Sequence, residues 1–275
     1  MITAPYPLRC KRLAALFQDS RSARNAMIKG DKQFMNEDIL AGLAPHGHLR
    51  AAINMSNFLL VSGEDKHGQP DGLSPDMARE IARRIDVRCE LIPFAGPGLL
   101  ADAAGGDIWD IGNIAIEPER AAVIEFSLPY IQIDANFLAR KGSGLSRNEQ
   151  VNRPDVETVL YGRSAYDLWL KENFTSAHYH REASMAESIA AFEAGQGDVL
   201  ACLKPKLRDM LADNPALQIV EPPFTAIRQA VGLNKGHPAA LAFVNETVAE
   251  LLASGFVADS LARHGVADKL SLPGG

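Results

Sequence analysis

Two hydrophobic periodicities alternate along the chain from about residue 48 onward. Short apolar runs at 49–54 and 88–93 predict strands. Between them, 74–85 places apolar residues on one face of a helix, with Ser74 as a candidate N-cap and Pro75 at the first helical position. Strand, helix and strand at this spacing predict a βαβ unit in a parallel sheet.

The same alternation continues to the end of the chain. Further strands are expected at 109–116, 135–139, 158–161, 198–202, 218–220 and 228–233, and further helices near 99–100, 164–170, 183–194, 238–253 and 256–264.

Two α/β blocks emerge, and residues after 231 are too few for a third. We expect an α/β, two-lobed fold in which residues 48–137 plus 231–275 form the first lobe and 138–230 the second. Residues 1–47 would be an N-terminal extension, partly helical. A chain that returns to its first lobe predicts a two-strand hinge and a central cleft, the preferred place for a small ligand.

Composition narrows the functional classes. The 275 residues carry a net charge of −6, which argues against nucleic acid as a partner. The sequence has no run of 18 apolar residues, so no membrane span is expected. Residues 1–30 lack a signal-peptide pattern, which leaves a cytoplasmic location open. Cys10, Cys89 and Cys202 are isolated, so neither a disulfide framework nor a zinc site is expected.

Five short motifs follow one another in a recognisable order. They are Asp71-Gly72-Leu73-Ser74-Pro75-Asp76, Trp109-Asp110-Ile111, Ile116-Glu117-Pro118-Glu119-Arg120, Phe126-Ser127-Leu128-Pro129-Tyr130 and Ala194-Gly195-Gln196-Gly197-Asp198-Val199. With them the chain resembles the type II periplasmic binding proteins, in particular the family 3 solute-binding proteins of polar amino-acid ABC importers. The resemblance covers about residues 48–265.

The resemblance implies a solute-binding protein that closes on a carboxylate-bearing ligand, works with an ABC permease in the periplasm and needs no cofactor or metal. Arg120 would bind the ligand carboxylate, because a planar guanidinium can donate two parallel hydrogen bonds to it. Ser164 would contribute from the start of a helix in the second lobe. The remaining implied pocket residues are Asn113, Ala115, Ser56, Asn57 and Phe58.

The sequence departs from the family pattern at the position of the acid that binds the ligand ammonium. That position is Leu203, and Lys204 and Lys206 follow it. Asp134 or Asp167 could replace the acid. Otherwise a carboxylate without an ammonium, or a dicarboxylate, fits better. Ala115 also stands where the family often has a hydroxyl residue.

Other readings of these residues stay open. Arg120 could be an exposed charge and Ser164 a plain N-cap, while Arg163 could also face the cleft. Tyr166 and Trp169 fit core packing better than a ligand site. Two His-x-His pairs, His46/His48 and His178/His180, are expected at the surface rather than on a metal.

Two other functions are considered. The same fold occurs in cyclohexadienyl dehydratases, which the chain also resembles and which need a carboxylic acid of raised pKa in the cleft. Glu117, Asp134 and Glu172 are the candidates for that acid. A cytoplasmic ligand sensor is the other alternative.

Overall fold

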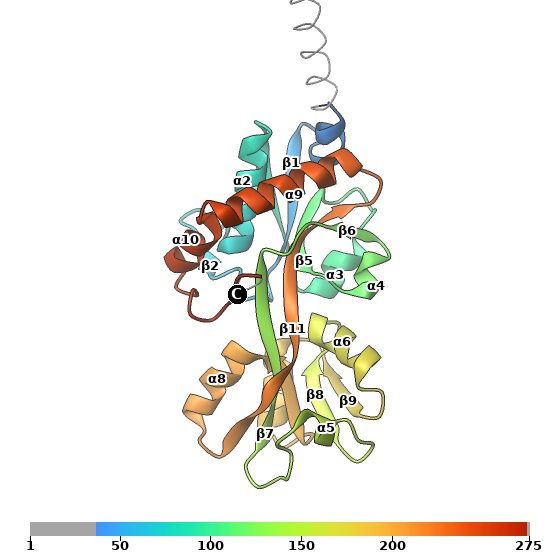
Figure 1. Cartoon of the computed structure of the whole chain (residues 1–275), viewed down its shortest axis with the longest axis vertical. Helices are drawn as coiled ribbons and strands as arrows, with labels where there is room; N and C mark the ends of the chain where they lie inside the picture. The colour runs from blue at the N-terminus through green and yellow to red at the C-terminus, as the bar shows by residue number, and fades with distance from the viewer. Residues whose placement is uncertain (1–36, 274–275) are drawn as a thin grey trace, which may run out of the picture.

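A computed structural model describes residues 37–273, and Figure 1 shows two lobes connected by two long strands. These strands are β7 (Ile131–Arg140) and β11 (Leu217–Asn234). They pair antiparallel from Gln229 opposite Ile131 to Leu217 opposite Arg140, and therefore run through both lobes as one ladder. The predicted two-lobed α/β fold with a two-strand connection is confirmed. The residue boundaries of the lobes stay a prediction.

The first lobe is built around the strand β1 (His48–Asn54), which pairs parallel with β4 (Arg88–Phe94) and β5 (Ile111–Ala115). The antiparallel pairing of β5 with β11 joins this lobe to the connection. Its remaining elements are β2 (Gly63–Glu64), β3 (Pro70–Asp71), α2 (Leu73–Arg84), α3 (Pro97–Asp102), α4 (Pro118–Ala121) and β6 (Ile124–Phe126).

The second lobe repeats the parallel arrangement. The strand β8 (Glu157–Tyr161) lies between β10 (Val199–Leu203) and β9 (His178–Glu182), parallel to both. The antiparallel pairing of β10 with β7 joins the lobe to the connection. Its helices are α5 (Asn148–Val151), α6 (Ala165–Asn173), α7 (Met185–Glu193) and α8 (Lys204–Asp213).

The chain ends on the first lobe, where α9 (Pro238–Ala253) and α10 (Phe256–Arg263) lie beside α2 (Figure 1). Ser260 of α10 donates a hydrogen bond to Asp76 of α2 at 2.6 Å. Within 37–273, no single helix has the length and apolar character to cross a membrane. The pair α9 and α10 passes that test together, with a bend of 68° between them.

The structure corrects several local predictions. Ser74 lies inside α2, whose N-cap is Gly72, and its hydroxyl is 3.5 Å from that of Tyr130. The two strands expected at 218–220 and 228–233 are one strand, β11, whose register shifts between Val220 and Thr225. Pro222 and Pro223 lack N–H donors, so this stretch looked like a break between strands. The strand β9 and the helix α8 were not predicted.

The predicted extension, residues 1–47, lies outside the described residues as far as residue 36. Residues 37–43 are helical and lead into β1. The sequence-based expectations for Cys10 and for the first thirty residues concern the undescribed part of the chain.

Candidate functional site

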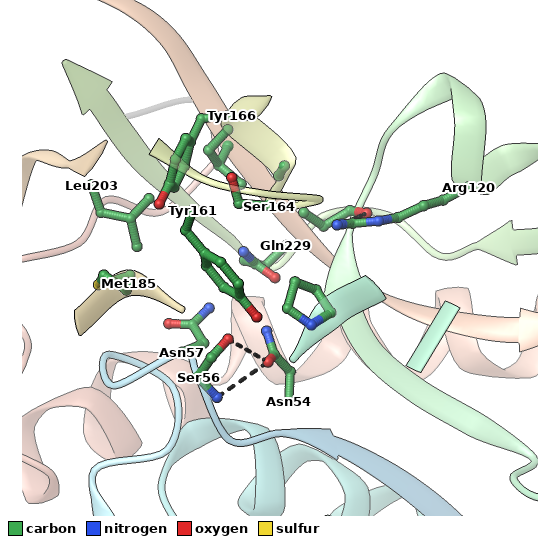
Figure 2. A pocket seen from close by; sticks show the side chains of 14 residues that line it. Asn54, Ser56, Asn57, Arg120, Tyr161, Ser164, Tyr166, Met185, Leu203 and Gln229 are labelled. Atoms are coloured by element: carbon green, nitrogen blue, oxygen red, sulfur yellow. Dashed lines mark hydrogen bonds between the residues drawn. The ribbon is translucent and has the colours of Figure 1, made fainter. Parts of the chain in front are cut away.

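A cavity lies between the lobes, next to the two connecting strands (Figure 2). The first lobe lines it with Asn54, Ser56, Asn57, Pro97, Ala115 and Arg120. The second lobe lines it with Tyr161, Ser164, Ala165, Tyr166, Met185 and Leu203. Ile227 and Gln229 of β11 complete the wall. The cavity thus lies at the carboxyl ends of β1, β5, β8 and β10, as expected for open α/β sheets.

Arg120 is buried in this wall, with 3% of its surface exposed. Its guanidinium donates to the carbonyl of Ala115 in the first lobe and to that of Arg163 in the second, each at 3.1 Å. None of the carboxylates in 37–273 forms an ion pair with it. Burial lowers the pKa of Arg120 to about 10, so the group stays cationic at neutral pH. A buried cation of this kind costs several kcal/mol unless an anion compensates it.

Ser164 combines both predicted roles. It is the N-cap of α6, where its hydroxyl accepts the N–H of Asp167 at 3.1 Å, and it also lines the cavity. Ala165, the first residue of α6, lines the cavity as well. The first turn of a helix carries N–H groups without intrahelical partners, which favours an anion there.

Of the other predicted pocket residues, Ser56, Asn57, Ala115 and Leu203 line the cavity, whereas Asn113, Phe58 and Arg163 do not. Asn113 is buried in the first lobe, where its amide donates to the carbonyl of Ser74 at 2.8 Å. Phe58 packs against the hydrophobic core. Arg163 is exposed and pairs across the lobes with Asp102 at 2.6 Å.

Several cavity residues were missed or assigned otherwise. Tyr166 was expected in the core, but it is both buried and part of the cavity wall. Tyr161 is the last residue of β8, and the rule that ligands bind at strand carboxyl ends could have found it. Gln229 and Met185 gave no local signal, because long-range pairing and helix packing bring them to the cavity.

Contact between the lobes is close on the side of α3 and α6. A Cβ atom on Gly96 would lie 2.0 Å from the Tyr161 hydroxyl, so a larger residue there requires the Tyr161 side chain to move. The Arg163–Asp102 pair lies here as well, and Lys171 of α6 pairs with Glu119 of α4 at 3.3 Å. The lobes are therefore closed on this side.

The acidic residues considered for catalysis or ammonium binding have different surroundings. Glu117 is buried, and desolvation raises its pKa to about 7, although the charge of Arg120 acts in the opposite direction. Glu172 is exposed. Asp134 lines a different cavity, and Asp167 is occupied by Arg181 Nε at 2.9 Å and the Arg163 N–H at 2.7 Å.

Lys204 also belongs to the cavity of Asp134, where its ammonium pairs with Glu221 at 2.8 Å. Lys206 lines a third cavity, between α7 and α8. The basic residues after Leu203 therefore do not face the cavity of Arg120. This removes the reason to expect a dicarboxylate there.

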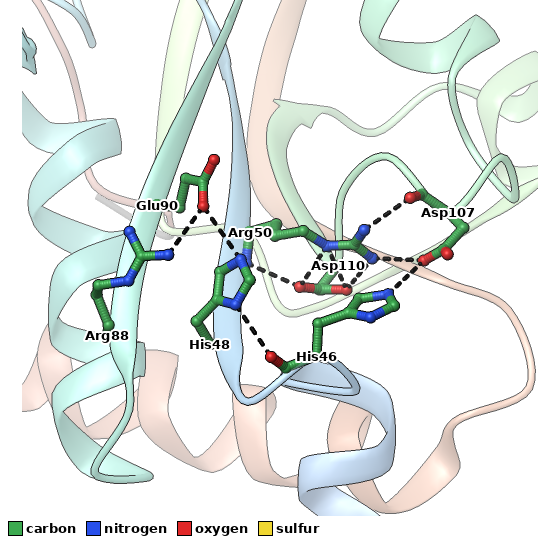
Figure 3. A network of polar contacts seen from close by, with 7 residues as sticks. All are labelled: His46, His48, Arg50, Arg88, Glu90, Asp107 and Asp110. Atoms are coloured by element: carbon green, nitrogen blue, oxygen red, sulfur yellow. Dashed lines mark hydrogen bonds and ion pairs between the residues drawn. The ribbon is translucent and has the colours of Figure 1, made fainter.

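Three histidines of the His-x-His motifs contact carboxylates, two of them in the network of Figure 3. His46 contacts Asp107 at 2.9 Å and His48 contacts Glu90 at 3.1 Å, next to the buried pair of Arg50 and Asp110. In the second lobe, His180 contacts Glu182 at 2.8 Å. These contacts involve three of the four histidines of the His-x-His motifs, and the expectation that no metal binds them stays a prediction.

Asp71, Asp76 and His264 lie close enough together to ligate a metal ion, which the sequence did not predict. The same carboxylate oxygen of Asp76 already accepts hydrogen bonds from Ser260 and from Arg263 at 2.7 Å. The group therefore fits an ion-pair network that attaches α10 to α2.

Comparison with known proteins identifies the family. Residues 50–266 match the model of the bacterial extracellular solute-binding proteins, family 3. The chain belongs to this family. Family 3 relatives include the ABC transporter glutamine-binding protein of Bacillus subtilis, 22% identical over 80% of this chain and 81% of that protein. The L-cystine-binding protein of Escherichia coli is 23% identical over 82% and 85%.

Solved structures agree on the fold. A mutant of ArgBP from T. maritima has a TM-score of 0.68 at 20% identity, covering 82% of this chain and 99% of that one. The ancestral amino acid-binding protein AncCDT-1, a precursor of cyclohexadienyl dehydratase, has a TM-score of 0.66 at 24% identity, covering 82% and 98%. Membership of family 3 favours a solute-binding protein over an enzyme.

Proposed function

We propose that this family 3 protein captures a small carboxylate-bearing solute in the cavity between its lobes and delivers it to an ABC-type importer. The observation that supports this most directly is the buried guanidinium of Arg120, which faces the cavity without a carboxylate partner in the described chain. A ligand carboxylate would supply the missing anion through a bidentate, charge-assisted contact.

Hinged closure is part of the proposal. The donors expected to bind the carboxylate come from both lobes, Arg120 from the first and the start of α6 from the second. A ligand that contacts both lobes stabilises the closed arrangement over an open one. The strands β7 and β11 are the only connections visible between the lobes in Figure 1, so they are the natural hinge.

The importer and the location rest on the family. Its members are described as extracellular, and the glutamine-binding relative is named as an ABC transporter protein. We therefore infer an exported protein with a permease partner. Pull-down of a permease from membranes by the ligand-loaded protein would test this.

The experiment for the site compares ligand-induced thermal stabilisation in wild type and Arg120→Ala. The probes are the proteinogenic amino acids and the 2-hydroxy and unsubstituted acids of the same skeletons. We expect one or more probes to raise the melting temperature of the wild type and none to raise that of Arg120→Ala. Arg153→Ala is the matched control, because Arg153 is an exposed arginine paired only with Asp155. A probe that stabilises Arg120→Ala as much as wild type would refute the carboxylate site.

The dehydratase alternative is tested in parallel. Glu117 meets one part of its requirement, an acid of raised pKa, but this carboxyl is buried beside Arg120 and does not line the cavity. Turnover of prephenate or arogenate that disappears in Glu117→Gln would establish this activity and displace pure solute binding.

A further inference from the structure

We propose that the cavity selects carboxylates that have no ammonium group, because the wall of the second lobe opposite Arg120 consists of neutral side chains around Leu203. This inference rests on the proposed function and specifies its ligand class. The expected ligand is a monocarboxylate with an apolar remainder. Any polar substituent next to its carboxylate is neutral, such as a hydroxyl or a carbonyl.

The inference that the ligand has no ammonium group rests on the charges of the residues that line the cavity. Of the described side chains that form the wall, Arg120 is the charged one, and the others are apolar or neutral. A carboxylate compensates this cation and makes the occupied cavity neutral. A zwitterionic amino acid would add an ammonium that must give up its hydration against Leu203, Met185 and Tyr161. An ammonium buried without an anion is strongly unfavourable.

The shape of the second lobe explains why Leu203 is important. Leu203 ends β10 and lies directly before α8, and its side chain is 6% exposed and packed into the wall. Figure 2 shows it beside Tyr166 and across the cavity from the Asn57 and Ser56 loop. The strand β10 places this position at the carboxyl end of the sheet, where a side chain can reach the ligand.

Tyr166 gives this wall a neutral polar atom. The Tyr166 hydroxyl is buried and has no hydrogen-bond partner among the described residues. Its polar neighbours are the Ser164 hydroxyl, which already accepts the Asp167 N–H, and the thiol of Cys202, a weak donor. Burial holds the pKa of Tyr166 well above its usual value, so the phenol cannot serve as an anion for an ammonium. It can exchange a hydrogen bond with a hydroxyl or carbonyl.

Nearby carboxylates do not replace the missing acid. Asp167 is held by Arg181 and by the Arg163 N–H, and Asp134 lies in the separate cavity with Lys204. Glu117 is the remaining buried acid near Arg120. It is not part of the wall, and its proximity to the guanidinium places it at the carboxylate end of the site.

The test uses matched probes that differ only at the second carbon. Leucine, 2-hydroxy-4-methylpentanoate and 4-methylpentanoate form one set. Phenylalanine, phenyllactate and phenylpropanoate form a second, and alanine, lactate and propanoate form a third. Calorimetry on the full chain at pH 7 should show that, in each set that binds, the acids without nitrogen bind at least about tenfold tighter than the amino acid.

Leu203→Asp should reverse this order, because it restores an anion where the ammonium would lie. Leu203→Asn is the control, since it adds polarity of similar size without a charge and should leave the amino acids the weaker ligands. Should Leu203→Asp fail to fold, the wild-type measurement alone still decides the question.

The possible outcomes separate the inference from the proposed function. Amino acids that bind wild type as tightly as the nitrogen-free acids, with that binding lost in Arg120→Ala, would overturn the inference and leave the proposed function in place. Binding that is independent of Arg120 would overturn both. Preference for nitrogen-free acids, lost in Arg120→Ala and reversed in Leu203→Asp, is the expected result.

Discussion

The two lobes present very different walls to the same cavity, although both are made from parallel strands followed by helices. The first lobe offers amide and hydroxyl groups and the buried cation of Arg120. The second offers the rings of Tyr161 and Tyr166, together with Met185 and Leu203. Under the proposed function, Arg120 of the first lobe supplies the cation for the ligand carboxylate, and the start of α6 in the second lobe adds N–H donors to it. The rest of the second-lobe wall would then discriminate among the groups attached to the carboxylate.

Among the following substitutions, one that hinders closure of the two lobes should have the largest effect on ligand affinity. In Gly96→Ala the new Cβ would meet the Tyr161 hydroxyl at 2.0 Å, whereas the backbone of Gly96 is extended and accepts any residue. We expect about 100-fold weaker ligand binding, which corresponds to about 3 kcal/mol, because closure then requires the Tyr161 ring to leave its place in the cavity wall. The measurement is a calorimetric titration, with small-angle scattering to detect the opening.

Gly63→Ala is the control for this change, because a Cβ there would meet no atom within 4 Å. Adding Tyr161→Phe to Gly96→Ala should recover part of the affinity, since it removes the clashing oxygen. Unchanged binding in Gly96→Ala would show that the close approach is not needed for closure.

The ionisation of Glu117 provides a test of the electrostatics around Arg120 in the first lobe. Its folded pKa of about 7 is above the ordinary value of 4.5 because the carboxylate is desolvated. The folded state therefore binds more protons than the unfolded state between these values, and stability falls as the pH rises from about 4.5 to about 7. Glu117→Gln should abolish this loss and be about 2 kcal/mol more stable than wild type above pH 7.

Chemical denaturation at pH 5 and pH 8 would measure this difference. Glu149→Gln is the matched control, since Glu149 is exposed and is not among the charges that act on Glu117. A ligand carboxylate should also bind more weakly as Glu117 ionises. Equal pH profiles for wild type and Glu117→Gln would contradict both expectations.

Arg120→Lys tests whether binding of the ligand carboxylate needs the planar, two-donor geometry of the guanidinium or only its positive charge. A lysine keeps the cation but cannot donate two parallel hydrogen bonds to one carboxylate, and it cannot reach the carbonyls of Ala115 and Arg163 together. We expect about tenfold weaker binding with an unchanged order of ligands. A changed order would mean that Arg120 contributes to discrimination, against the proposed division.

Breaking the exposed ion pair between Asp102 and Arg163 should have the smallest effect on ligand affinity. Asp102→Asn breaks the contact with Arg163, whose side chain is 55% exposed. Such pairs are worth between about 0 and 1 kcal/mol and weaken with salt. Ligand affinity should fall less than about fivefold, and the difference should disappear at high ionic strength. A larger loss of ligand affinity that persists at high ionic strength would show that this ion pair contributes to closure of the lobes.

Much of the fold could be predicted because its signals are local. The apolar periodicity of α2 and the short runs of β1 and β4 identified a βαβ unit from the sequence. The position of Arg120 just beyond β5 indicated a site for the same reason. Ser164 was expected as an N-cap of α6 and is one.

The part of the site that could not be predicted depends on the direction of side chains at the ends of strands and helices. Leu203 and Lys204 are adjacent in sequence, yet one lines the cavity of Arg120 and the other lines the cavity of Asp134. A strand alternates its faces and a helix starts at Lys204, so one step along the chain changes the side of the molecule. Sequence spacing alone could not separate these two positions.

The end of the described chain suggests a practical use. Ser271 exchanges two backbone hydrogen bonds with Gln132 of β7, at 2.8 and 3.1 Å, and so attaches the tail to a connecting strand. A thiol-reactive fluorescent dye coupled to Leu272→Cys, at a position that is 39% exposed, would lie beside the hinge and outside the cavity of Arg120. The protein could thereby serve as a reagentless optical biosensor whose signal follows the bending of β7.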